Sequence, residues 1–393
     1  MKIENARVIP RCRLLRERSV GKSCRTRIVL NHLYSRYSLA TRGSGRGWLL
    51  AGFTVAAFVG FLSLAPVARA QDSTIRAVQN IFDPLSAPAE TLYNVSLLVT
   101  AVCAVIFLIV GGLLTYAIIR YRRRGPEDDQ EEPPQVYGSA AIELAWTVPP
   151  ILIVVMLVLV TARTIGEIQH HQMPTAAEEI RIIGHRFWWE VRYPKHGVVT
   201  ANEIHVPLSD RKNRVPTEMI LESADVIHGF WVPQLNGKTM LVPNYRNTMW
   251  VEPYATGIYL GNCTVLCGPQ HANMLIRVIV DKPDVYQKWL ESQKQPPVSD
   301  PQTVEGQKQF IANSCGTCHT IDGVRGANGV FAPDLTHFAS RATLGSGVAP
   351  NDEQNLRTWV QDPQRLKQGC LMPDMQLSDN QVDAIVAYLR TLK

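Results

Sequence analysis

Three stretches in the first half of the chain are long, apolar and uncharged: residues 48–66, 93–119 and 144–162. The second and third are each long enough to cross a bilayer as a helix. Four arginines follow the second stretch almost directly, and clustered basic residues place the adjoining loop in the cytoplasm. The pattern therefore predicts a transmembrane helical hairpin over residues 93–165, after which the chain continues on the outer side of the membrane.

The first of these stretches has the surroundings of a secretory signal peptide. Basic residues precede it, and Ala-Arg-Ala at residues 68–70 supplies a small-x-small cleavage site after it. We therefore expect a leader over residues 1–70 that ends in a signal peptide at 48–70, followed by an exported segment at 71–92. The alternative is a first membrane helix that the mature protein keeps.

From residue 179 to residue 281 the pattern changes to short runs rich in Val, Ile, Trp and Tyr, separated by Pro, Gly and Asn. Regular short strands of this kind are typical of a β-sandwich or barrel. The predicted strands are 180–193, 203–206, 218–221, 248–251, 258–260 and 275–280. We expect an all-β sandwich domain over residues 171–290.

A polar, Pro-rich linker is predicted at residues 291–302, and a helical domain follows it over residues 303–393. The last helix of this domain should start after Ser378 as its N-cap and carry apolar residues with i, i+3, i+4, i+7 spacing. These residues are Val382, Ile385, Val386, Leu389 and Leu392. The predicted fold class is thus multidomain: a transmembrane α-helical hairpin, an all-β sandwich and an all-α C-terminal domain.

Basic residues are concentrated in the leader. Residues 1–46 contain 12 Lys and Arg against 2 Asp and Glu, whereas the part from Gln71 onward contains 27 basic and 32 acidic residues. The mature part therefore has a net charge near −5, although the whole chain has +6. This balance removes the support for a nucleic-acid partner.

The sequence Cys-Gly-Thr-Cys-His, which ends at His319, has the C-x-x-C-H pattern of covalent haem attachment. Cys315 and Cys318 would form the two thioethers, and His319 can reach the iron from the same turn. A redox dithiol and half of a zinc site are the alternatives, but neither a βαβ pattern nor a second pair of cysteines follows. A thioether should supply the sixth iron ligand, and Met372 and Met375 are the candidates.

A second set of soft ligands lies upstream, mostly within twelve residues of one predicted loop. The set is His228, Cys263, Cys267, His271 and Met274. Two Cys and two His would suit a zinc ion, but a thioether suits copper rather than zinc. A mononuclear blue-copper site normally uses one Cys, whereas two thiolates can bridge two copper ions. The set favours a binuclear copper centre, and a zinc-stabilised structural domain is the alternative.

These motifs resemble those of a known family, cytochrome c oxidase subunit II. The similarity covers Asp225-Val-Ile-His228, the loop from Cys263 to Met274, and Glu143-x-x-Trp146-Thr147-x-Pro149 at the start of the third apolar stretch. The resemblance implies a cupredoxin-like fold with a binuclear CuA centre. It also implies that the carbonyl of Val265 is a further copper ligand. Asp225 either orients the loop of His228 or only caps a turn.

Residues 303–393 resemble the class I cytochrome c domain, which binds one haem c covalently. The similarity covers the C-x-x-C-H motif, Ala-Pro-Asp-Leu at 332–335, and Gly-x-x-Met-Pro, which ends at Pro373. In that family the Met before Pro is an iron ligand. The resemblance therefore implies that Met372 is the haem ligand rather than Met375.

The chain departs from the subunit II pattern at two positions. Val265 stands where the family commonly has a Glu whose side chain contributes to a Mg²⁺ site. Phe187 stands where many members have a Trp that receives electrons from a docked soluble cytochrome c. The loss of that Trp fits a chain that carries its own donor. Of the neighbouring Trp188 and Trp189, which should point to opposite faces of a strand, we expect at least one to lie in the core.

The resemblance implies the electron-entry subunit of a haem–copper terminal oxidase. Electrons would pass from the chain's own haem c to CuA and then to the haem of catalytic subunit I, which reduces oxygen to water, so no residue of this chain is expected to be catalytic. Further expected partners are subunit III and a cytochrome c or cytochrome bc complex as donor. The expected location is a bacterial inner membrane, with both metal domains on the periplasmic side.

Two other functions fit parts of the same pattern. One is the same electron-transfer module in a nitric oxide reductase complex. The other is a copper-binding assembly protein, although such a protein has no need of a covalent haem.

Overall fold

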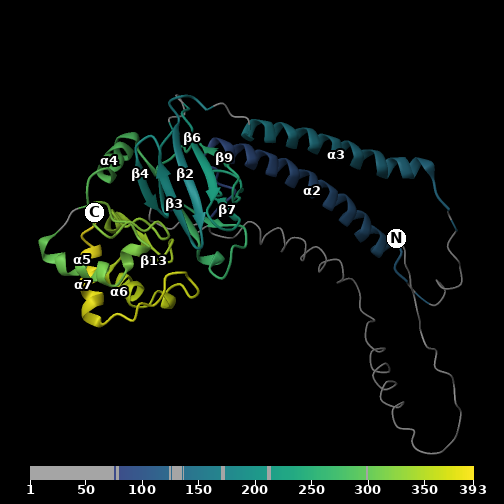
Figure 1. The fold of residues 1–393 in the computed structure, drawn as a ribbon. Coiled ribbons are helices and arrows are strands. Elements are labelled where there is room, and N and C mark those ends of the chain that lie inside the picture. The colour runs from purple at the N-terminus through teal and green to yellow at the C-terminus, as the bar shows by residue number, and fades with distance from the viewer. Residues whose placement is uncertain are drawn as a thin grey trace, which may run out of the picture. The chain divides into compact units, whose positions relative to one another are not determined.

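The computed structural model describes residues 75–76, 79–123, 125, 135, 137–169, 173–209, 214–297 and 300–393. The leader and its predicted signal peptide at 48–70 lie outside the described residues. Two long helices precede an all-β domain, and a smaller, mainly helical domain ends the chain (Figure 1). We call residues 178–293 the β domain and residues 300–393 the C-terminal domain.

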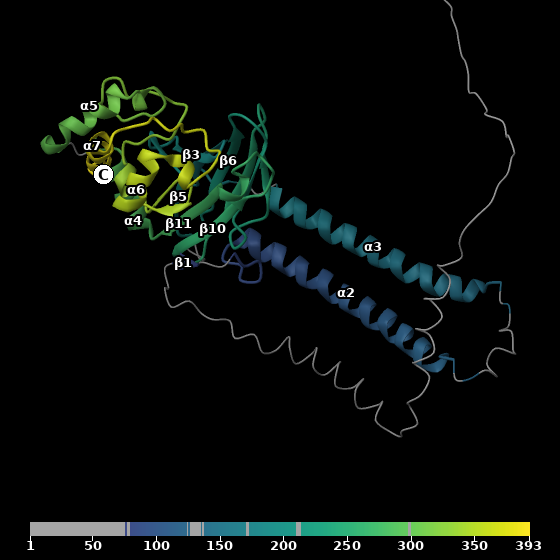
Figure 2. The same ribbon diagram turned by 90° about the horizontal axis from the view of Figure 1, so that it is seen from below.

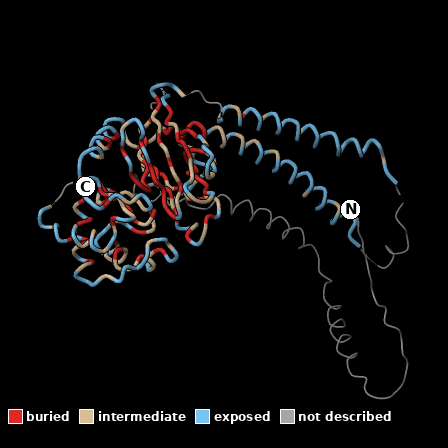
Figure 3. Tube along the Cα trace, in the orientation of Figure 1, coloured by how far each residue is buried: buried red, intermediate tan, exposed pale blue. Residues whose placement is uncertain are grey.

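Helices α2 (Ala87–Arg120) and α3 (Ala140–Gln169) have the length and composition of membrane-spanning helices. They contain 34 and 30 residues and run side by side in both ribbon views (Figures 1 and 2). Most of their apolar side chains are exposed, as the pale blue helices of Figure 3 show. A helix needs about 20 apolar residues to cross a bilayer core, and both helices are longer than that. Their exposed apolar surfaces are suited to contact with lipid.

Both helices begin before the uncharged stretches that predict them. The uncharged stretch 144–162 would place Pro149 and Pro150 in the first turns of the second membrane helix, but they lie well inside α3, so that expectation is wrong. The helix extends back to Ala140 because the residues ahead of the uncharged stretch, Ala140 to Glu143, include good helix formers. The uncharged stretch marks only part of the helix and does not show at which residue the helix begins.

The β domain contains two sheets. The five-stranded sheet has the order β4-β3-β2-β6-β9, and the other has the order β5-β11-β10-β7-β8 with short β1 beside β10. The strands of the first are β2 (Glu178–His185), β3 (Trp188–Tyr193), β4 (Val198–Ala201), β6 (Thr217–Ser223) and β9 (Asn247–Val251). Those of the second are β1 (Ile75–Arg76), β5 (Glu203–Pro207), β7 (His228–Trp231), β8 (Thr239–Leu241), β10 (Gly257–Cys263) and β11 (Leu275–Asp281).

The inner faces of the sheets form one hydrophobic core, which appears in red in Figure 3. Alternation puts Ile276, Val278 and Val280 of β11 into it, while their neighbours on the strand are partly exposed. Trp189 and Tyr259 are fully buried in the same core. The predicted all-β sandwich is confirmed.

One predicted strand is in fact two. The chain reverses after His185, so residues 180–193 form the antiparallel pair β2 and β3, with Gly184 opposite Trp189. No Asn-Gly or Asp-Gly pair marks this turn, which is why the sequence reads as one strand. Strands β4, β7 and β8 are not among the predicted strands.

Helix α4 (Pro283–Gln293) closes the β domain, since its Tyr286 and Leu290 are buried in that domain's core. It extends into the range 291–302 that the sequence predicts as linker. A 3₁₀ turn, η3 (Pro301–Thr303), occupies the other end of that range.

The C-terminal domain contains α5 (Val304–Ala312), α6 (Glu353–Gln361) and α7 (Asp379–Leu389), with a two-stranded ribbon of β12 (Thr343–Leu344) and β13 (Ala349–Pro350). Short 3₁₀ turns lie between them: η4 (Cys315–Thr317), η5 (Phe338–Ser340) and η6 (Pro363–Arg365). Ser378 is the N-cap of α7, and all five apolar residues predicted for its inner face are buried.

Candidate functional site

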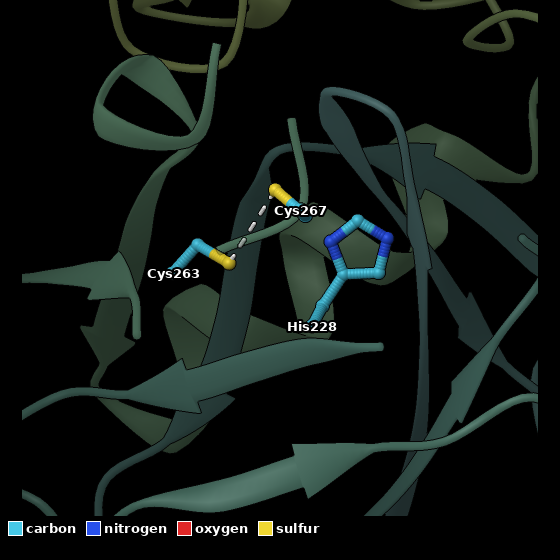
Figure 4. Close-up of side chains that lie close together, drawn as sticks. All are labelled: His228, Cys263 and Cys267. Atoms are coloured by element: carbon cyan, nitrogen blue, oxygen red, sulfur yellow. Dashed lines mark hydrogen bonds between the residues drawn. The ribbon is translucent and has the colours of Figure 1, made fainter. Parts of the chain in front are cut away.

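The predicted copper ligands meet at one end of the β domain. His228 begins β7, Cys263 ends β10, and the connection from β10 to β11 carries the rest of the set. Its last part is the 3₁₀ turn η2 (His271–Asn273), which Met274 follows. We call residues 263–274 the ligand loop. Figure 4 shows the side chains of His228, Cys263 and Cys267 gathered together.

The sulfur atoms of this cluster are buried and close to one another. The Sγ atoms of Cys263 and Cys267 are 3.9 Å apart, which is too far for a disulfide. Cys267 Sγ is also 3.9 Å from Met274 Sδ and 3.8 Å from His271 Nδ1. One ligand atom each of His228, Cys263 and Cys267 lie within 4.8 Å of one another. Such a set of thiolates, imidazoles and a thioether suits a soft metal.

Asp225 holds His228 through one ring nitrogen, so the other ring nitrogen is available to a ligand. Its Nε2 is 2.8 Å from Asp225 Oδ1, and because the carboxylate only accepts, Nε2 is the protonated nitrogen. Its Nδ1 is buried and has no hydrogen-bond partner among the described residues. An orphaned buried acceptor beside two thiols fits a bound metal ion, which would take that lone pair.

Asp225 is ionised over the neutral range. Burial would raise its pKa, but hydrogen bonds from His228 and from the backbone N–H groups of Val226 and Arg186 outweigh burial and lower the pKa to about 2. Since a lowered carboxyl pKa means that the charged form is lost only as the pH falls towards that value, the pair with His228 persists at neutral pH.

A hydrogen bond joins the two thiols of the ligand loop. The hydrogen bond with Cys267 lowers the pKa of Cys263 to about 3, and the same bond raises the pKa of Cys267. A metal cation would displace the remaining proton and bind both sulfurs as thiolates. The carbonyl oxygen of Val265 lies 3.4 Å from Cys263 Sγ, so it also faces the cluster.

Gly229 lets the ligand loop approach β7. A Cβ atom at this position would lie 2.3 Å from Thr264 Oγ1 and 3.1 Å from Val265 N, so any side chain would push the loop away. The close approach also allows the N–H of Thr264 to donate to the carbonyl of Gly229.

The predicted haem residues line a cavity of about 340 Å³. Its walls include Cys315, Cys318, His319, Met372 and Met375, and we call it the haem cavity. A mostly apolar wall with two thiols and an imidazole fits a covalently attached haem. Both Met372 and Met375 line the cavity, so the lining alone does not show which of them would be the iron ligand.

His319 is prepared to bind a metal as a neutral imidazole. Burial lowers its pKa, which keeps the ring uncharged at neutral pH. Its Nδ1 lies 2.7 Å from the carbonyl oxygen of Pro333, and since a carbonyl only accepts, Nδ1 carries the proton. Nε2 is therefore free to bind iron.

The segment with Met372 is fixed by a residue that the sequence did not reveal. Gln364 Nε2 donates to the carbonyls of Met372 at 3.0 Å and of Cys370 at 3.2 Å, while its Oε1 accepts from the N–H of Gly369 at 2.7 Å. Nothing in the spacing of a lone Gln signals this role.

The haem cavity is shared by both domains. Arg186, Phe187, Trp188 and Asn202 of the β domain line it together with the C-terminal residues. The ring of Phe187 also packs on the ligand loop, because a Cβ atom on Gly268 would lie 3.0 Å from it. Phe187 thus reaches from the haem cavity to the residue beside Cys267.

The two tryptophans after Phe187 have different surroundings. Trp189 is fully buried in the core, as expected for at least one of them. Trp188 lines the haem cavity and stacks on His185, with ring centroids 4.3 Å apart.

Three family models match the chain in order. The transmembrane domain of cytochrome c oxidase subunit II matches residues 76–163, the periplasmic domain of the same subunit matches 178–281, and cytochrome c matches 303–393. The matches follow the helices, the β domain and the C-terminal domain described above.

Curated relatives give the same result. A cytochrome c oxidase subunit 2 of Alkalihalophilus pseudofirmus is 34% identical over 318 residues, which is 79% of this chain and 90% of the relative. One of Bacillus sp. strain PS3 is 30% identical over 329 residues, with the same coverage. The solved periplasmic domain of subunit II of cytochrome oxidase of Bradyrhizobium japonicum is 27% identical, covers 31% of this chain and 97% of its own, and has a TM-score of 0.29.

The matched domains define the cofactors and the setting. A subunit II periplasmic domain carries a CuA copper centre and a cytochrome c domain carries haem c, so the chain holds both, as a membrane-anchored oxidase subunit that works with other oxidase subunits. The chain therefore belongs to the cytochrome c oxidase subunit II family, in the form with a cytochrome c domain at its C-terminal end.

Proposed function

We propose that this chain takes electrons into a haem–copper oxidase through its own haem and passes them to its copper centre. The observation that carries the proposal is the position of Phe187, which lines the haem cavity and also packs against Gly268 beside Cys267. Both cofactor sites therefore border one side chain. The bound groups supply one-electron oxidation and reduction, and the residues around them hold the groups close together.

In this proposal the haem is held by Cys315 and Cys318 as thioethers and by His319 and Met372 as iron ligands. The neutral His319, with its proton on Nδ1, supports the first iron ligand. The hydrogen bonds of Gln364 support Met372, because they fix its own carbonyl and that of Cys370, two residues before it. A thioether ligand raises the reduction potential of a haem, which suits electron transfer.

The proposed copper ligands are His228, Cys263, Val265 through its carbonyl, Cys267, His271 and Met274. Their closeness supports the proposal, as does the unpartnered Nδ1 of His228. Cys263 and Cys267 would hold the copper as thiolates, and the bound centre would supply one-electron transfer. Oxygen chemistry belongs to the partner, catalytic subunit I, whose haem would receive the electron.

We further propose that both cofactor domains lie on the periplasmic side of the membrane. The cluster of arginines at the end of α2, which includes Arg120, supports a cytoplasmic loop between the two helices. The β domain, which follows the second helix, would then lie outside. Subunit III and a cytochrome c or bc complex as donor are the further partners in this proposal.

The electron path can be tested by rapid mixing of the assembled oxidase with a reductant. We expect the haem c absorbance to show reduction first and the near-infrared absorbance of the copper pair to respond next, followed by oxygen consumption. Reduction of copper before haem c would contradict the proposed order.

Replacing Asp225 with alanine is expected to weaken copper binding by about 10–100-fold, the usual effect of removing a partner that orients a metal-binding His. Asp281 provides a matched control, since it pairs with His205 at 2.7 Å in the same domain without belonging to the ligand cluster. Competition of the metal-free chain with a chelator measures both variants. Equal copper affinity in Asp225→Ala and Asp281→Ala would show that Asp225 has no orienting role.

A further inference from the structure

The two cofactor domains are joined by a buried polar interface in addition to the linker. Ser346 of the C-terminal domain accepts from the N–H of Leu275 with its carbonyl at 3.2 Å and donates to the carbonyl of Leu275 with its hydroxyl at 3.1 Å. Gly347 packs against the same residue, since a Cβ atom there would lie 3.1 Å from the Cβ of Leu275. Leu275 directly follows Met274, so this contact lies at the end of the ligand loop.

Lys367 supplies the central contact from the C-terminal domain. Its side chain is almost completely buried, and its Nζ donates to three carbonyl oxygens: Phe187 O at 2.8 Å, Asn273 O at 2.8 Å and Gly345 O at 2.7 Å. The first two belong to the β domain. The ammonium group of Lys367 has three N–H donors, which when buried require one acceptor each, and the three carbonyl oxygens provide them.

These acceptors belong to functional segments. Phe187 is the side chain that borders both cofactor sites, and Asn273 precedes Met274 in the ligand loop. The side-chain amide of Gln270, which precedes His271, donates to the carbonyl of Gln368, the residue after Lys367. The segment around Lys367 therefore braces the ligand loop close to two proposed copper ligands.

Glu203 makes the reciprocal contact from the β domain. Its carboxylate is buried and accepts from the backbone N–H groups of Ala342 and Thr343 and from the Thr343 hydroxyl, at 2.9–3.1 Å. Arg277 lies 3.9 Å away and partly balances its charge. Hydrogen bonds to a charged carboxylate are stronger than those between neutral groups. Loss of the carboxylate or of its donors would leave a buried polar group without a partner.

We propose that Lys367 and Glu203 lock the C-terminal domain on the β domain, so that the haem is docked permanently beside the copper ligand loop instead of searching for it on a flexible tether. Lys367 is then a positioning residue for the electron step. The role of Lys367 in electron transfer rests on the proposed function, whereas the locked interface itself does not depend on the electron path.

Hydrogen exchange of the full chain in the assembled oxidase tests the interface directly. The amides of Ala342 and Thr343 should be protected in the wild type, because Glu203 accepts from them. We expect Lys367→Met to speed their exchange at least tenfold, although Lys367 does not touch these amides, because both contacts hold one interface. Glu203→Gln should speed it as well. Lys308→Met is the matched control, since Lys308 is an exposed lysine of the same domain and should leave exchange unchanged.

The kinetics of the same variants give a second readout. In the wild type the rate of electron transfer from haem to copper should not depend on solvent viscosity, because no docking motion is needed. In Lys367→Met it should fall by about tenfold or more and become dependent on viscosity, since small displacements of reacting groups are costly. Unchanged haem and copper absorbance spectra would show that both sites are still formed.

Two results would overturn the proposal. One is that Ala342 and Thr343 exchange as slowly in both Lys367→Met and Glu203→Gln as they do in the wild type. The other is that the rate of electron transfer from haem to copper in the wild type falls as viscosity rises. If Lys367→Met does not assemble, Glu203→Gln decides alone. Absence of any electron transfer from haem to copper in the wild type would refute the proposed function, while the exchange data would still report on the lock.

Discussion

Replacing His228 with alanine is expected to remove the copper centre and leave the haem spectrum intact. The imidazole is fully buried beside both thiols and its Nδ1 has no partner among the described residues, so alanine removes that lone pair from the cluster. His228 does not line the haem cavity, so the C-terminal domain should bind its haem as in the wild type. Copper analysis together with the visible spectrum of the same sample measures both effects.

His205→Ala is the control for this experiment. His205 is also a histidine of the β domain paired with a carboxylate, Asp281, but it stacks on Trp289 and lies outside the ligand cluster. It should keep the wild-type copper content. If His228→Ala retains two copper ions, the ligand assignment is wrong.

Replacing Met372 with alanine is expected to lower the haem potential by on the order of 100 mV or more, within the roughly 0.8 V range that axial ligands control. The loss of the thioether removes the ligand that raises the potential of an electron-transfer haem. The haem should remain covalently bound, because Cys315 and Cys318 are unchanged. Redox titration of the haem absorbance measures the change, and the thioether-to-iron absorption band should disappear.

Met375→Ala separates the two candidates, since both methionines line the haem cavity. It should keep the band and change the potential only slightly. Loss of the band in Met375→Ala but not in Met372→Ala would reverse the assignment.

The sequence was most informative where the chemistry is local. Cys315, Cys318 and His319 lie on one turn, and four of the proposed side-chain copper ligands lie on one loop, so spacing alone predicts both groups. The membrane helices were predicted for the same reason, because a bilayer requires one continuous apolar segment. Asp225 was also within reach of prediction, being only three residues from His228.

Contacts between distant segments were beyond such reasoning. Glu203 and Thr343 are 140 positions apart, and Lys367 and Phe187 are 180 apart, so no spacing rule connects them. A lone Lys and a lone Glu read as solvated surface charges, yet both are buried. The turn after His185 was missed for a different reason, since it lacks the usual turn residues and depends on the sheet around it.

The most direct test is the metal and haem content of the full chain after complete maturation. We expect two copper ions and one covalently bound haem per chain, with the copper lost when His228 is replaced. Zinc alone, or a single metal ion, in the pocket of Cys263 and Cys267 would contradict it.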